Sequence, residues 1–141
     1  MMQASYYNPF KDNVVEIEEC SDDGIQGLFD VILAMESQRG HPTLELMHGN
    51  GVSLSLSTDG ERAYLVWVNS LGESFHSVSD GRYIGPLIFD YFGSWSEAPQ
   101  QYLVGIDDAM QCARTFCLTG TADTDRVLFE PDLLWIFCIH E

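Results

Sequence analysis

Basic side chains are scarce in this sequence. One lysine, Lys11, and five arginines stand against 22 acidic residues, and the formal net charge is −16 at pH 7. A surface with this charge repels nucleic acid and anionic membranes, and it attracts basic proteins and cations. Direct binding to DNA or RNA is therefore the function that the composition argues against most strongly.

Long apolar segments are also missing. The longest run, LLWIFCI at 133–139, is far too short to span a bilayer, and we interpret it either as a buried final strand or as an exposed apolar tail. The first residues, MMQASYYNPFKDN, lack the basic segment and the apolar stretch of a signal peptide. These features predict a cytoplasmic protein that does not bind membranes.

Motifs of the common catalytic and metal sites are absent as well. The sequence has no glycine-rich phosphate loop with lysine, no HExxH, no GxSxG and no CxxC. We therefore predict no catalytic residue, no metal and no cofactor. The cysteines are interpreted as free buried thiols and the histidines as turn and sheet residues: Cys20, Cys112, Cys117, Cys138, His41, His48, His76 and His140.

The length of 141 residues fits a single domain, 1–141, and 45 % apolar residues suffice for a core. Helices are predicted at 21–40 and 106–120. Ser21 or Asp22 is expected to cap the first helix, and Asp107 the second. Gly120 is expected to end the second helix. The first helix has an apolar stripe at helical spacing, formed by Ile25, Leu28, Phe29, Ile32 and Met35.

Short strands are predicted at 13–20, 43–47, 74–78, 87–93 and 101–105, and the clearest signal is a hairpin at 51–69. Its Asp59-Gly60 pair is typical of a two-residue turn. Closing that turn pairs Leu56 with Ala63, Leu54 with Leu65 and Val52 with Trp67, so that the apolar residues of both arms share a face.

Residues 74–78 and 87–93 are expected to extend this hairpin as the third and fourth strands of the same sheet. Two loop lengths fit the turn at 69–73, and they place His76 on opposite faces. The predicted fold class is α+β, a curved and mostly antiparallel sheet (a β-meander) with two helices packed on one side.

The stretch FDYFGSWSEAPQQYLVG at 89–105 is rich in aromatic residues and has no basic one. We interpret Tyr91 and Trp95 as anchors of a protein interface, since Tyr and Trp dominate binding hot spots and charges around them steer association. The surrounding acids of this predicted interface are Glu61, Glu73, Asp80, Asp90 and Glu97. The alternatives are an ordinary solvated acidic surface and a role for Phe92 and Trp95 in covering the core.

Two quoted segments carry a resemblance to a known family. GVSLSLSTDGERAYLVWVNSLGESFHSVSD is followed by FDYFGSWSEAPQQYLVGIDDAMQCARTFCLTG, with its F-x-Y-x-G, E-x-P, A-x-x-A-x-x-F and T-G elements. In this order they resemble the Imm1 family of immunity proteins from bacterial polymorphic toxin systems. The resemblance covers 14–130. The leader 1–13 and the apolar tail 131–141 are candidates for peripheral segments, the tail packing on the sheet edge or mediating dimerisation.

The resemblance implies a protein without chemistry of its own that binds a cognate toxin one-to-one. The toxins of this family are often nucleic-acid deaminases, including DNA deaminases, and sometimes nucleases. Such enzymes need a basic cleft, because phosphate contacts dominate their affinity for nucleic acid. An inhibitor with a charge of −16 is expected to occupy that cleft, with Tyr91 and Trp95 filling the pocket for a flipped base.

Two other functions remain open at this stage. One is an acidic DNA mimic or adaptor that binds another basic protein, with no toxin involved. The other is a small hydrolase or metal enzyme in which His48 and His76 meet in space with nearby acids.

Overall fold

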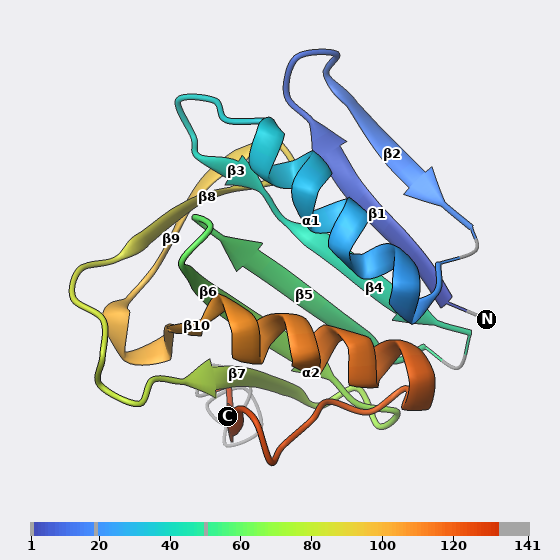
Figure 1. Cartoon of the computed structure of the whole chain (residues 1–141), viewed down its shortest axis with the longest axis vertical. Helices are drawn as coiled ribbons and strands as arrows, with labels where there is room; N and C mark the ends of the chain where they lie inside the picture. Colours follow the sequence, from blue (N-terminus) through green and yellow to red (C-terminus); the bar gives the residue numbers. More distant parts are fainter. Residues whose placement is uncertain (1, 19, 50, 133–141) are drawn as a thin grey trace, which may run out of the picture.

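The computed structural model describes residues 2–18, 20–49 and 51–132. Within these residues, two α-helices, α1 (Ile25–Ala34) and α2 (Ile106–Thr119), accompany two sheets (Figure 1). The strands are β1 (Met2–Asn8), β2 (Asn13–Ile17), β3 (His41–Pro42), β4 (Leu44–His48), β5 (Ser53–Thr58), β6 (Arg62–Val68), β7 (Ser74–Val78), β8 (Leu87–Tyr91), β9 (Ser94–Ala98), β10 (Val104–Gly105) and β11 (Leu128–Pro131). Short 3-10 turns, η1 (Asp22–Gly24) and η2 (Gln100–Tyr102), precede α1 and β10.

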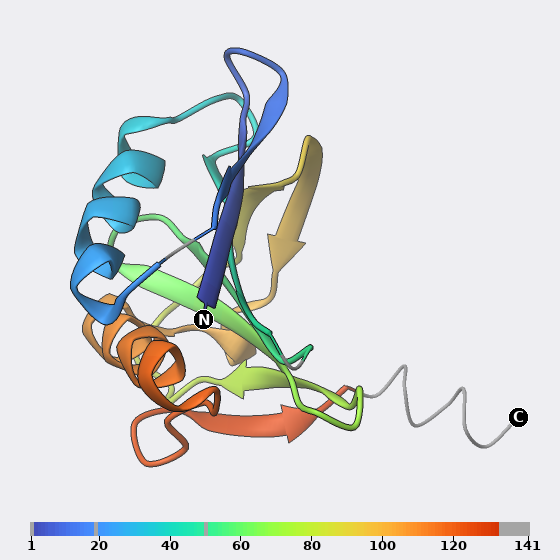
Figure 2. The same cartoon turned by 90° about the vertical axis from the view of Figure 1, so that its right-hand side faces the viewer.

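The large sheet is antiparallel throughout, in the order β11-β7-β6-β5-β4-β1-β2. The short strand β10 pairs with the start of β6, whereas β7 pairs with the end of β6. Both helices lie on one face of this curved sheet (Figure 2). The predicted α+β class, with a meander and two helices on one side, is confirmed.

The core lies between the helices and the sheet. Alternating strand residues point toward the helices, as the period of two in β4, β5 and β6 requires. The sheet contributes Leu44, Leu46, Leu54, Leu56 and Leu65, all fully buried. The helices contribute Ile25, Leu28, Phe29, Ile32, Ala109, Cys112, Ala113 and Phe116. The predicted stripe of the first helix is therefore buried, with Met35 packed against its edge.

The predicted register of the β5–β6 hairpin is wrong by two residues. The observed pairs are Thr58 with Ala63, Leu56 with Leu65 and Leu54 with Trp67. Since side chains alternate with a period of two, this shift leaves the predicted faces intact. The serines of β5 still share the opposite face with Tyr64 and Val66.

The turn itself explains the shift. The Asp59 carboxylate accepts hydrogen bonds from the backbone N–H groups of Glu61 and Arg62. The Thr58 hydroxyl accepts from the Gly60 N–H and donates to the carbonyl of Arg62. These side-chain bonds stabilise a longer loop than a two-residue turn, because Asp and Thr satisfy backbone groups within it.

Residues 87–93 were predicted to form the fourth strand of the meander, and this prediction is wrong. Their strand, β8, belongs to a second sheet in the order β3-β8-β9, and β11 occupies the place beside β7 instead. The Arg62 guanidinium donates to the carbonyls of Ile84, Gly85 and Pro86, which holds the connecting loop over the start of β6. The small sheet packs on the helix-free side through Leu87, Phe89 and Ala98, which form a buried cluster with Leu103 from the segment before β10.

The leader is not peripheral. Residues 2–8 form β1, which pairs with β2 on one side and with β4 on the other. Met2 and Ala4 are buried in the core. The predicted strand at 101–105 is only partly formed, since η2 takes up 100–102 before β10. Of the predicted apolar tail 131–141, Pro131 ends β11 and pairs with Phe75, and residues 133–141 lie outside the described residues.

The helix ends differ from the predictions at three points. The first helix begins at Ile25 behind η1 and ends at Ala34, well before Gly40, and neither Ser21 nor Asp22 caps it. Gly105, not Asp107, is the N-cap residue of α2. The predicted end at Gly120 is confirmed: Gly120 has φ 73° and donates its N–H to the carbonyl of Phe116.

Candidate functional site

The β8–β9 hairpin carries the two aromatic residues predicted to anchor a partner. It stands on the side of the large sheet that carries no helix (Figure 2). Tyr91 is 46 % and Trp95 55 % exposed, so neither ring is buried in the core. The register pairs Tyr91 with Ser94 and Trp95 with Asp90, which places the two rings on opposite faces of the hairpin.

Trp95 lies on the outer face of this hairpin, turned away from the large sheet. Ile88 and Glu97 pair with each other on the same face, and both are exposed. We call Ile88, Trp95 and Glu97 the outer hairpin face. It joins two apolar side chains to one carboxylate, which is the composition of a small protein-binding patch.

Asp90 is fully buried, unlike the other predicted interface acids. Its carboxylate forms an ion pair with Arg39, with 3.3 Å between Nε and Oδ2, and accepts a hydrogen bond of 2.8 Å from the Gly93 N–H. Its backbone carbonyl accepts from the Thr43 N–H. Asp90 therefore holds the hairpin turn and β3 in place and is not available at the surface.

The remaining predicted acids do not join the outer hairpin face. Glu61 lies at the start of β6 and Glu73 in the turn after its end, so roughly 20 Å of strand separates them. Asp80 forms an ion pair with Arg82 in the loop after β7. The Glu73 carboxylate accepts a hydrogen bond from the side-chain amide of Asn69 within the turn. The structure thus brings Trp95 and Glu97 together, but not Glu61, Glu73 and Asp80.

A second surface lies on the large sheet itself, opposite the helices. We call it the helix-free face. The strand pairing aligns one row of side chains across it: Glu16, Ser5, Glu45, Ser55, Val66, His76 and Glu130. Gln3, Met47 and Ser53 form the next row.

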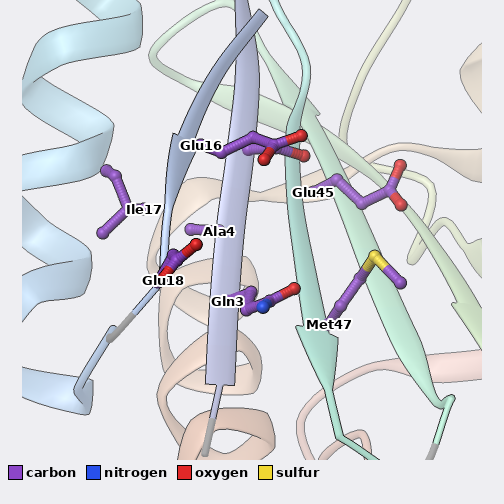
Figure 3. A pocket seen from close by; sticks show the side chains of 8 residues that line it. Gln3, Ala4, Glu16, Ile17, Glu18, Glu45 and Met47 are labelled. Atoms are coloured by element: carbon purple, nitrogen blue, oxygen red, sulfur yellow. The ribbon is translucent and has the colours of Figure 1, made fainter.

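Glu45 is the most unusual residue of this face. Its side chain is half-buried, and burial raises the pKa of its carboxyl group. Figure 3 shows the Glu16 side chain lying across β1 toward Glu45, with Gln3 and Met47 below them. Glu16, Glu18 and Glu45 together line a shallow hollow of about 90 Å³.

A second hollow, of about 220 Å³, separates this face from the inner side of the β8–β9 hairpin. Thr43, Ser55 and Ser57 line its floor, and Phe89 and Tyr91 line its wall. Burial, and next the negative charge of Glu45, raise the pKa of Tyr91. Tyr91 therefore belongs to the helix-free face, whereas Trp95 belongs to the outer hairpin face.

Sequence reasoning missed Glu45, although a signal was present. Glu45 stands between Leu44 and Leu46 in a predicted strand, and this alternation assigns it to a polar face. The sequence pattern does not say that this face stays free of helices.

The two histidines of the proposed enzyme alternative lie on opposite faces of the sheet. The His48 Nε2 atom is 3.0 Å from the carbonyl oxygen of Phe116, on the side of the helices. His76 pairs with Val66, so it faces the helix-free side, where it packs on Tyr102. Within the described residues, no group of three or more His, Cys, Asp or Glu side chains is arranged to hold a metal ion.

The structure thus presents two exposed surfaces suited to binding, one aromatic and one acidic. A family model described as Immunity protein Imm1 matches residues 9–131. The chain belongs to the Imm1 family of immunity proteins, and its partner is accordingly a cognate toxin. No curated protein matches the sequence. In the part of the chain that the structure describes, neither helix has the length and apolar character needed to cross a bilayer.

Proposed function

We propose that this protein neutralises a toxin that acts on nucleic acid, a DNA deaminase in the first instance, by covering the basic cleft of its active site. The protein would act by binding one-to-one, without catalysis or cofactor, in the cytoplasm. A polyanion-binding cleft needs positive charge, because phosphate neutralisation dominates affinity for DNA and RNA. An acidic inhibitor competes for the same charge.

The distribution of charge carries this proposal. Four of the six basic residues are engaged by acids of the chain itself: Arg39 by Asp90, Arg62 by Asp59, Arg82 by Asp80 and Asp108, and Arg126 by Asp108. The other acids that the structure describes are mostly exposed, so most of the net charge of −16 lies at the protein surface. Such a field accelerates association with a basic partner.

The outer hairpin face supplies the contact in this proposal. Trp95 fits a pocket on the toxin, and Glu97 lies beside it on the rim. Tyr91 contributes at the hairpin edge. Asp90 acts from within, by holding the hairpin turn. Glu61, Glu73 and Asp80 lie elsewhere and contribute to the steering field.

The test is co-expression with the toxin domain encoded next to this gene, with purification on a tag carried by the toxin. We expect a one-to-one complex, loss of toxicity, and loss of deaminase activity in proportion to the immunity protein added. Association should slow steeply as salt is raised. A complex whose association rate ignores salt would overturn the electrostatic mechanism.

The acidic-adaptor alternative makes a different prediction in the same experiment. If the neighbouring gene encodes no toxin and the protein instead binds another basic protein, the proposal that it neutralises a nucleic-acid toxin is wrong. A toxin that is neither a deaminase nor a nuclease would leave the immunity function in place but remove the nucleic-acid cleft from the proposal.

A further inference from the structure

The helix-free face is a large part of the sheet surface that neither α-helix covers, since both pack on the other side (Figure 2). The small sheet covers the end near Thr43, Ser57 and Tyr64. Tyr102 of η2 covers His76 on β7, which is buried. The floor is made of short side chains, with Ser5, Ser53 and Ser55 between the acids. A surface of this kind is open to a partner along β1, β4 and β5.

The charge on this face is of one sign. Among the described residues, the rows that cross it contain Glu16, Glu45 and Glu130, and no lysine or arginine. Glu18 lines the same hollow as Glu16 and Glu45. A basic partner is the occupant that such a face complements.

Glu45 adds an energetic argument to the charge count. Burial disfavours its charged form, and within the described part of the chain its carboxylate forms no hydrogen bond or ion pair that offsets this cost. A cationic side chain placed over it by a partner would supply the missing interaction. Residues that carry such an unfavourable free energy in the free protein are often found in binding sites.

We propose that the helix-free face is a second toxin-binding surface, and that its occupant is a lysine- or arginine-bearing segment of the cognate toxin seated over Glu45 between Glu16 and Tyr91. The proposal rests on the function proposed above in one respect, the basic character of the toxin. It adds a surface that is separate from the outer hairpin face. Tyr91 links the two, since it stands on the hairpin and lines the hollow over the sheet.

Two other occupants fit this surface less well. A second copy of the chain carries the same charge of −16 and repels the acids of this face. The segment 133–141 is mostly apolar and contains no lysine or arginine, so it offers Glu45 no permanently charged cation. Both are outcomes that the experiment below can return.

The first experiment compares two triple variants with equal changes in net charge. Glu16→Gln, Glu18→Gln and Glu45→Gln neutralise the helix-free face. Asp30→Asn, Glu36→Gln and Asp125→Asn, all exposed, serve as the matched control. We expect the first triple to weaken binding to the purified toxin by at least about tenfold, and the control by no more than about twofold. Equal effects of the two triples would overturn the proposal, because only the general field would then matter.

A steric pair of variants tests the same surface without changing charge. Gln3 is exposed on the floor of the face, and Val31 is exposed on α1. We expect Gln3→Trp to abolish the complex and Val31→Trp to leave it intact, with both proteins unfolding like the wild type. Binding that survives Gln3→Trp would place the toxin elsewhere.

The outcomes separate the two proposals. Failure of the wild-type protein to bind or inhibit any neighbouring toxin contradicts the proposed function. Normal binding by the wild type, with no effect of either the acidic triple or Gln3→Trp, contradicts this inference alone. If removal of 133–141 or dilution to monomer exposes the face and increases toxin binding, the tail or a second copy is its occupant and the inference is wrong as stated.

Discussion

Arg39 and Asp90 form an ion pair that joins the loop before β3 to the β8–β9 hairpin. Asp90 has no exposed surface, and Arg39 is about one-third exposed, with 3.3 Å between Nε and Oδ2. The Asp90 carboxylate also accepts from the Gly93 N–H in a turn where Phe92 has a positive φ of 48°. A buried acid thus fixes the strained turn that presents Trp95.

Loss of Arg39 should therefore destabilise the protein more than loss of both partners. We expect Arg39→Met to lower the free energy of unfolding by about 3 kcal/mol, since it leaves a buried carboxylate without its cation. The double variant Arg39→Met/Asp90→Asn should recover part of this loss. Urea denaturation of the two variants and of Asp90→Asn gives the coupling energy, and additive losses would contradict the interaction.

Glu45→Gln is expected to stabilise the protein at neutral pH. Burial raises the pKa of Glu45 above its ordinary value of 4.5. The part of the free energy of unfolding that depends on the protonated carboxyl group is fully present below pH 4.5 and is lost as the pH rises through the raised pKa. The charged or ionisable groups around it are Glu16 beyond β1, Glu18 in the same hollow and Tyr91 on β8, and none of these supplies a cation.

The glutamine cannot ionise, so it avoids this loss. The melting temperature of Glu45→Gln should exceed that of the wild type at pH 7 to 8, and the difference should shrink toward pH 4. Thermal unfolding across that range measures it. The exposed control Glu36→Gln should show no such trend, and a variant less stable than the wild type at pH 8 would contradict the prediction.

How far the sequence predicts this fold depends on the range of the interactions involved. The faces of β5 and β6 follow from their alternation, which is local. The register was missed because Thr58 and Asp59 side chains remodel the turn. The sheet to which β8 belongs depends on contacts of Arg62 with a loop more than twenty residues away.

The same distinction applies to the predicted interface. Tyr91 and Trp95 were interpreted as interface anchors, and the structure leaves both rings partly exposed. Asp90 was assigned to the interface because it stands among aromatic residues, but it is buried beside Arg39, which comes from a distant loop. The uncovered face around Glu45 arises only when both helices pack on the other side of the sheet.

β1 is expected to be essential for folding, although residues 2–8 precede the part of the chain that matches the family. Ser5 pairs with Glu16 on one side and with Glu45 on the other. Proline at this position removes a backbone donor from a strand paired on both edges. Ser5→Pro should abolish cooperative unfolding by circular dichroism, whereas Ser5→Thr should unfold like the wild type. A cooperative Ser5→Pro protein would show that β1 is dispensable.

Trp95→Ala should weaken toxin binding without changing stability. The ring is 55 % exposed, so its removal leaves no core cavity, whereas anchor residues of this type often contribute 2 kcal/mol or more, by rough estimate, to an interface. Leu71, 81 % exposed in the turn after β6, provides the control Leu71→Ala. Titration calorimetry of both variants with the toxin distinguishes them. Equal affinity of Trp95→Ala and the wild type would remove the outer hairpin face from the proposed interface.

The described thiols should be unreactive in the folded protein. Burial raises the pKa of Cys112 to about 11 and that of Cys117 to about 12, and it also raises the pKa of Cys20. At pH 8 these groups are almost wholly protonated, and alkylating reagents attack the thiolate. In a Cys138→Ser variant, iodoacetamide should therefore label all three cysteines far more slowly in buffer than in denaturant, as followed by mass spectrometry. Rapid labelling of Cys117 in the folded protein would show that the end of α2 opens readily and that its packing against Cys20 and the sheet is weaker than the structure indicates.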